Sequence, residues 1–171
     1  MIYFDNAATT KNKPAEVIDA VVNAMKNFGN SSRGVHEESL SADRIVFETR
    51  KKLAKMFNVG NSRQVVFTKN ATESLNIAIN GLFLENDHII TSVAEHNSVL
   101  RPIHYLKEKG VEVSYIGVSE NGVINFDEIP SLIKANTKAI VITHASNVTG
   151  NITDLKKYGD FCRNNNLLFI R

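Results

Sequence analysis

The sequence predicts an α/β fold, with a mainly parallel sheet covered by helices on both faces. From residue 64 onward, short apolar runs typical of strands alternate with segments that are mostly long enough for a crossover helix. Such strand–helix–strand units are right-handed and build parallel sheets with helices on their faces. The predicted strands are residues 65–67, 88–91, 111–116, 139–143 and 167–170.

Composition narrows the class of protein. A chain of 171 residues with 43% hydrophobic and 22% charged residues is long enough to bury roughly 70% of its unfolded surface as one soluble domain. The net charge of +2 comes from 20 basic and 18 acidic residues that are well mixed, which argues against nucleic acid as a partner. No stretch resembles a signal peptide or a membrane span, and the single cysteine, Cys162, allows no internal disulfide. We therefore expect a cytoplasmic protein that contacts no membrane.

Residues 65–75 read as a buried strand, a polar turn and the first turn of a helix. Asn70 and Glu73 have the spacing of a capping box. Apolar positions then recur at helical spacing, at Leu75, Ala78, Ile79 and Leu82. A helix opened in this way directs unpaired N–H groups and its positive dipole end beyond the strand, which suits a phosphate. The alternative is a well-capped helix that binds nothing.

The first 60 residues predict an arm followed by two helices. One begins near Pro14 with an apolar stripe, and the other runs from about Glu37 to Phe57. Between them lies the turn-rich segment GNSSRGVH, residues 29–36, which carries side chains able to bind an anion or a carboxylate. A plain helix-to-helix connection explains the same segment.

Polar clusters follow three of the predicted strands, at residues 69–72, 95–98 and 144–150. In open parallel sheets ligands bind beyond the carboxyl ends of the strands, so these clusters are expected to share one site. The common dinucleotide and nucleoside-triphosphate loops are absent, and no histidines or carboxylates have metal-ligand spacing. An anion cradle, an imidazole and an amide suit a planar, phosphorylated cofactor, and pyridoxal phosphate meets that description.

Five segments together resemble the class V aminotransferase-fold enzymes, and within them the cysteine desulfurase-like branch. In order, they are DNAATT (residues 5–10), GNSSRGVH (29–36), FTKNATESLN (67–76), EHNSVL (95–100) and SNVTG (146–150). The resemblance covers essentially the whole chain. It implies the fold type I of pyridoxal phosphate enzymes and a homodimer, with residues 1–171 forming an N-terminal arm and the first part of the large cofactor-binding domain.

The resemblance also implies roles for individual residues. Ala71 and Thr72 would bind the cofactor phosphate. His96 would stack on the pyridine ring and relay protons, and Asn147 would hydrogen-bond the phenolic oxygen of the ring. The remaining candidates belong to the substrate pocket, its rim or the dimer contact, and they are Asn6, Ala7, Ala8, Arg33 and His36.

The match stops before the family's Schiff-base lysine, ring-nitrogen aspartate and sulfur-accepting cysteine. The sequence therefore looks like the front part of such an enzyme, truncated, and this part alone is expected to be inactive. Cys162 is expected to be a packing residue. The implied function is pyridoxal phosphate-dependent sulfur transfer from cysteine, or a related amino acid, to an enzyme cysteine and onward to a sulfur-acceptor protein. Two alternatives stay open: a non-catalytic cofactor-binding or interaction module, and a related enzyme such as a selenocysteine lyase or an aminotransferase.

Overall fold

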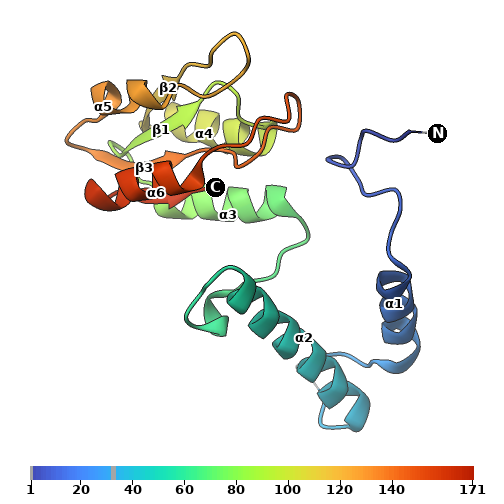
Figure 1. Ribbon diagram of the computed structural model, residues 1–171. Helices are drawn as coiled ribbons and strands as arrows, with labels where there is room; N and C mark the ends of the chain where they lie inside the picture. The colour runs from blue at the N-terminus through green and yellow to red at the C-terminus, as the bar shows by residue number, and fades with distance from the viewer. Residues whose placement is uncertain (1, 32–33) are drawn as a thin grey trace. The chain divides into compact units, whose positions relative to one another are not determined.

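The structure, a computed structural model, describes residues 2–31 and 34–171 and divides into two compact units (Figure 1). The first unit ends at Phe67 and the second is Thr68–Arg171. The first contains the helices α1 (Ala15–Asn27) and α2 (Glu37–Met56) and the short 3₁₀ helix η1 (Ser62–Gln64). Both predicted helices are confirmed. Pro14 is the N-cap of α1, and α1 ends where Phe28 takes an extended conformation.

The second unit holds the alternating series that the sequence predicts. Its elements are α3 (Ala71–Leu82), β1 (His88–Ser92), α4 (Asn97–Glu108), β2 (Glu112–Ile116), η2 (Phe126–Glu128), α5 (Ile129–Leu132), β3 (Thr137–Val141), α6 (Leu155–Asn164) and β4 (Leu168–Ile170). The described strands form a four-stranded, all-parallel sheet in the order β2-β1-β3-β4. The predicted fold class is thus confirmed.

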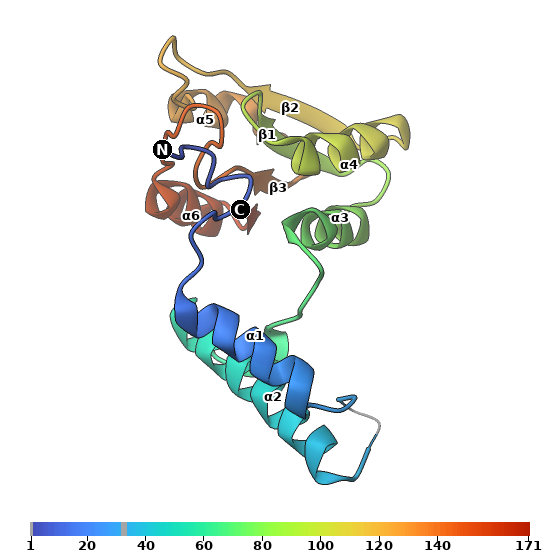
Figure 2. The ribbon, with the colours of Figure 1, turned by 90° about the vertical axis from the view of Figure 1, so that its right-hand side faces the viewer.

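Helices cover both faces of this sheet. Figure 2 shows α3 and α4 on one side of the strands and α5 and α6 on the other. Ile89 and Val141 pack with α3 and α4, whereas Ile90 and Ile140 pack with the residues of α5 and α6. These four side chains are fully or almost fully buried. The alternation along β1 and β3 therefore divides the core into two layers, as expected for strands buried on both sides.

The strand predicted at residues 65–67 is wrong. This segment is extended but joins no ladder, and the side chains of Val66 and Phe67 are 76% and 44% exposed. Within the described residues, both sides of β1 and β3 are already taken by other strands of the sheet. A short apolar run specifies a strand only where a neighbour can accept its hydrogen bonds, and periodicity alone does not reveal that neighbour.

His88 holds three strands together at the amino end of the sheet. Its ring is fully buried. One ring nitrogen, Nδ1, lies 2.7 Å from Thr137 Oγ1, and the other, Nε2, lies 2.9 Å from Ser114 Oγ. Burial lowers the pKa of His88, and the nearby Lys134 cation lowers it further, while Glu112 acts in the opposite direction. The folded state therefore favours the neutral form of the His88 ring.

We expect acid to destabilise the protein through His88. In the unfolded chain the imidazole binds a proton with a pKa of about 6.5, whereas the folded chain holds its pKa lower. The unfolded state then binds more protons in this window, so the free energy of unfolding falls as the pH drops below about 6.5. Urea unfolding midpoints at neutral and mildly acidic pH measure the effect. In His88→Gln the free energy of unfolding should fall less between neutral and mildly acidic pH than in the parent protein. An equal fall in both proteins would show that His88 is not the group responsible.

Candidate functional site

The sheet has a switch point between β1 and β3. From β1 the chain crosses through α4 to β2 on one side, and from β3 it crosses through α6 to β4 on the other side. The loops that leave the two central strands therefore diverge, and such a crevice is where open α/β sheets bind ligands. A hollow of about 640 Å³ lies here, lined by residues that include Ala71, Ser74, Glu95, His96, Thr143 and His144. Its volume is in the range of small-molecule pockets.

The N-terminus of α3 contributes an anion-binding end to this hollow. The side chain of Asn70 accepts from the Glu73 N–H at 2.9 Å, and Glu73 accepts from the Lys69 N–H at 2.7 Å. The predicted capping pair thus forms, although Glu73 reaches one residue further back than in a standard capping box. The carbonyl of Asn70 accepts from Ser74 N–H. The N–H groups of Ala71 and Thr72 keep no partner within the helix, because they lie in its first turn.

His96 lines the same pocket as the start of α3 and is the N-cap of α4. Its Nδ1 accepts the Ser98 N–H at 3.1 Å and lies 2.8 Å from Ser98 Oγ. An Nδ1 that accepts a backbone hydrogen bond leaves the proton of the neutral ring on Nε2. The exposed ring also lines a smaller hollow together with Thr72. The structure thus brings Ala71, Thr72 and His96 together.

Glu95 is a site residue that the sequence analysis did not single out. Its side chain is 7% exposed. The Oε1 atom accepts a hydrogen bond from Ser92 Oγ at 2.6 Å and another from the Thr143 N–H at 3.0 Å. The second contact joins residues 48 positions apart, which no local pattern reveals. Burial raises the pKa of the Glu95 carboxyl, against the two hydrogen bonds that lower it.

The loop after β3 is only partly in the pocket. His144 and Ala145 line it, but Asn147 is exposed on the following turn and lies outside both hollows. That turn is closed by the Gly150 N–H, which donates to the Ser146 carbonyl at 2.9 Å. The role of Asn147 at a cofactor ring stays a prediction.

The other predicted residues lie in the first unit. Asn6, Ala7 and Ala8 form an exposed turn, in which the Ala8 N–H donates to the Asp5 carbonyl at 3.2 Å. His36 is the N-cap of α2 without a side-chain cap bond. The candidate Arg33 lies outside the described residues. Their assignment to a substrate pocket or dimer contact stays a prediction.

The site residues can bind the phosphate of a phosphorylated cofactor, but the described residues offer it no covalent partner. Two free N–H groups at a helix N-terminus match a phosphate dianion, and the hollow beside them is wide enough for a small ring. None of the described residues that line the two hollows is a lysine or a cysteine. Cys162 lies on the buried face of α6, and burial raises its pKa to about 11. The prediction that Cys162 is a packing residue is confirmed.

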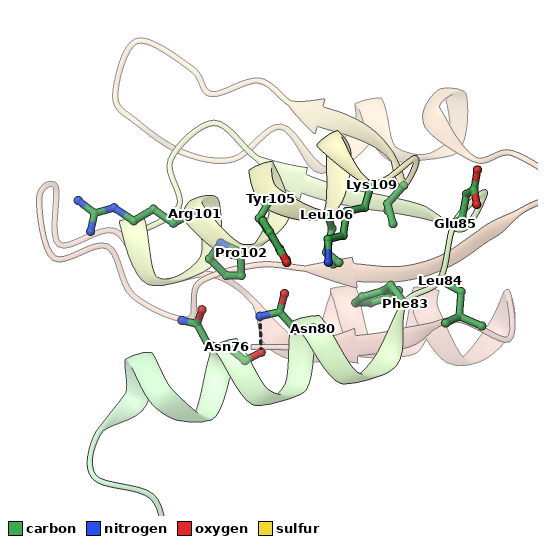
Figure 3. Close-up of a pocket in the computed structure, with 11 residues that line it drawn as sticks. Asn76, Asn80, Phe83, Leu84, Glu85, Arg101, Pro102, Tyr105, Leu106 and Lys109 are labelled. Atoms are coloured by element: carbon green, nitrogen blue, oxygen red, sulfur yellow. Dashed lines mark hydrogen bonds between the residues drawn. The ribbon is translucent and has the colours of Figure 1, made fainter.

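Another hollow, of about 760 Å³, lies in the groove between α3 and α4. Figure 3 shows Asn76 and Asn80 projecting from α3 toward Pro102 and Tyr105 of α4. Asn80 Nδ2 donates to the Asn76 carbonyl at 2.8 Å. The groove contains none of the predicted site residues. It adjoins the smaller hollow at Thr72 and His96, with which it shares the lining residues Asn76 and Arg101.

Two further kinds of site are absent from the described residues. They contain no group of three or more histidine, cysteine, aspartate or glutamate side chains that could hold a metal ion. Among the same residues, no helix is long and apolar enough to cross a membrane.

Comparison with known proteins establishes the family. Residues 2–170 match the family model described as aminotransferase class-V. The chain belongs to this family. It is 35% identical over 175 aligned residues to the cysteine desulfurase IscS of Buchnera aphidicola subsp. Baizongia pistaciae, covering 98% of this chain and 43% of that protein. The IscS of Plasmodium falciparum is 33% identical, with 32% of its length covered.

Solved structures agree with this assignment. The apo cysteine desulfurase of Thermococcus onnurineus NA1 superposes with a TM-score of 0.89 at 31% identity, over 98% of this chain and 42% of that one. A structure described as SspA in complex with cysteine gives a TM-score of 0.90 at 28% identity, over 99% of this chain and 49% of that one. The chain thus spans less than half the length of these relatives.

Proposed function

We propose that these residues form the first part of the cofactor-binding unit of a pyridoxal phosphate-dependent, cysteine desulfurase-like enzyme. The observation that carries the proposal is the meeting of the α3 N-terminus and His96 at the β1/β3 switch point. An anion site and an exposed aromatic ring that line one hollow match the phosphate and the ring of a phosphorylated pyridine. Membership of the class V family and the cysteine desulfurases among its relatives support this choice.

Each residue has a defined task in this proposal. The N–H groups of Ala71 and Thr72, aided by the dipole of α3, bind the phosphate. His96 would stack on the ring, and the Ser98 N–H bond to its Nδ1 holds the imidazole in place. Asn147 would donate to the phenolic oxygen of the ring. A role in substrate binding for Asn6, Ala7, Ala8 and His36, which the family resemblance implies, is part of the proposal.

Bound pyridoxal phosphate supplies an electron sink that lets an amino-acid substrate lose a group from its carbon skeleton. The proposed substrate is cysteine, the proposed product is sulfur passed to a cysteine of the enzyme, and the proposed partner is a sulfur-acceptor protein. A cytoplasmic location, expected from the sequence, remains part of the proposal.

A second candidate is a cofactor-binding or interaction module without catalysis. It is favoured by one specific observation: neither a lysine nor a cysteine lines the two hollows in the described part of the chain. Such a module would bind pyridoxal phosphate reversibly through its phosphate and ring. A selenocysteine lyase or an aminotransferase would use the same pocket residues.

His96→Asn tests the cofactor site. Asparagine is a good N-cap, so it keeps the start of α4 while it removes the ring. An aromatic contact is worth about 0.5–1.5 kcal/mol, so the dissociation constant for pyridoxal phosphate should rise roughly two- to tenfold. Absorbance titration with the cofactor measures it. His104→Asn, on the exposed face of the same helix, is the matched control. Equal affinities in the parent chain and His96→Asn would contradict the site.

The homodimer is a proposal that the surface of α1 supports. None of the described residues of α1 is buried. Its apolar side chains are exposed at Val17, Ile18, Val21, Val22 and Met25. Contiguous apolar surface of this kind marks interaction sites. We expect sedimentation velocity to show dimers or larger species, and Val21→Asp with Met25→Asp to reduce them, while Asn23→Asp changes little. A stable monomer at high concentration of the parent chain would contradict the proposal.

A further inference from the structure

We propose that Glu95 is a positioning residue, which fixes the loop after β3 against the loop after β1 and so sets the width of the switch-point pocket. The inference rests on the proposed function in so far as the pocket holds a cofactor. It assigns to Glu95 no contact with that cofactor. Its action is on the two loops that carry His96 and His144.

One carboxyl oxygen of Glu95 joins the loop after β1 to the loop after β3. Glu95 Oε1 accepts from Ser92 Oγ at 2.6 Å, and Ser92 Oγ in turn accepts from the Ala94 N–H at 3.2 Å. The same Oε1 accepts from the Thr143 N–H at 3.0 Å. The end of β1 is thereby folded back on itself and joined to the first loop residues after β3.

Thr143 anchors the loop that follows it through two hydrogen bonds. Its carbonyl accepts from Thr153 Oγ1 at 2.8 Å, and its own Oγ1 donates to the Ala145 carbonyl at 3.2 Å. The Thr153 N–H donates to the His144 carbonyl at 2.8 Å. A shift of Thr143 would therefore move the pocket wall formed by His144 and Ala145.

The second carboxyl oxygen takes no part in joining the loops. Glu95 Oε2 is buried and has no hydrogen-bond partner in the described part of the chain, so the carboxyl holds both loops through Oε1. Leaving a buried charge without a partner is costly, which agrees with the raised pKa of this carboxyl. A neutral acid still accepts both hydrogen bonds through its carbonyl oxygen, and the amide of glutamine has the same shape and the same acceptor.

The experiment compares Glu95→Ala with Glu95→Gln by two measurements. Amide hydrogen exchange reports the Thr143 N–H directly, and absorbance titration with pyridoxal phosphate reports the pocket. Loss of two hydrogen bonds at about 0.5–1.5 kcal/mol each predicts, for Glu95→Ala, roughly tenfold faster exchange at Thr143 and roughly tenfold weaker binding. Glu95→Gln should stay near the parent protein in both.

Glu128→Ala is the matched control. Glu128 is another loop-tying carboxylate, which accepts from the Gly117 N–H at 2.8 Å and from Asn125 Nδ2 at 2.9 Å. It lines neither hollow of the candidate site. Its loss should therefore lower stability without changing cofactor affinity. If Glu128→Ala and Glu95→Ala weakened pyridoxal phosphate binding equally, the positioning role of Glu95 would be overturned, because the effect would then come from lost stability alone.

The two measurements also separate this inference from the proposed function. If the parent protein binds no pyridoxal phosphate, the proposed function fails, and the exchange rate at Thr143 decides the role of Glu95 in joining the loops. A folded Glu95→Ala protein with parental exchange and affinity overturns the inference. Should Glu95→Ala not fold, Glu95→Asp shortens the side chain by one methylene group and draws the carboxyl away from the Thr143 N–H, and parental values of both quantities in that variant overturn the inference equally.

Discussion

A polypeptide of these 171 residues, supplied with pyridoxal phosphate and cysteine, should release no sulfide above the rate of the free cofactor. The reason lies in the pocket itself. Covalent attachment of the cofactor requires a lysine, and sulfur transfer requires a reactive thiolate. The described residues that line the site contain neither, and Cys162 is buried with its pKa raised to about 11.

Sulfide assay and borohydride reduction with the cofactor, followed by peptide mapping, test this expectation together. A longer cysteine desulfurase treated in the same way is the positive control. We expect weak, scattered labelling of surface lysines. Stoichiometric labelling of one lysine, for example Lys69 beside the N-terminus of α3, together with sulfide release, would show that this chain supplies its own covalent anchor.

Ile140→Ala should produce a large loss of stability. Ile140 is fully buried on β3, in the layer that includes Ile90 and Tyr158. Removing three carbons from such a site leaves a cavity and costs about 2–5 kcal/mol. That is a large part of the total for a domain of this size. Urea unfolding followed by circular dichroism measures the difference.

Ile152→Ala is the matched control, because its side chain is 77% exposed. Its expected change is within about 0.5 kcal/mol. A similar loss at both positions would mean that the two-layer core around β3 does not form as described.

The sequence predicted those features that depend on neighbouring residues. Asn70 and Glu73 marked the start of α3 through their spacing, and both form cap contacts. The alternation of apolar runs predicted the parallel sheet. The strand predicted at residues 65–67 failed because it depends on distant residues. An extended apolar segment becomes a strand only when it pairs with another strand elsewhere in the chain.

Long-range contacts account for what the sequence analysis missed at the site. Glu95 was visible as part of the EHNS cluster, yet its connection to Thr143 depends on the order of the strands. The sequence analysis assigned His96 to a cofactor ring, and the structure shows in addition that His96 is the N-cap of α4, with its ring exposed in the pocket. The switch point itself required knowledge that β3 lies beside β1 and not beside β2.

That order of strands also has a consequence for how the chain folds. β1 and β2 follow each other closely, whereas the bond between His88 and Thr137 and the bond between Glu95 and Thr143 close loops of 49 and 48 residues. Contacts so distant along the chain form late, because loop closure must precede them. The β1–α4–β2 segment is therefore expected to collapse first. The docking of β3 then buries His88 and Glu95 in the same step, at opposite ends of the β1–β3 pair. The pocket therefore forms only in the last step of folding.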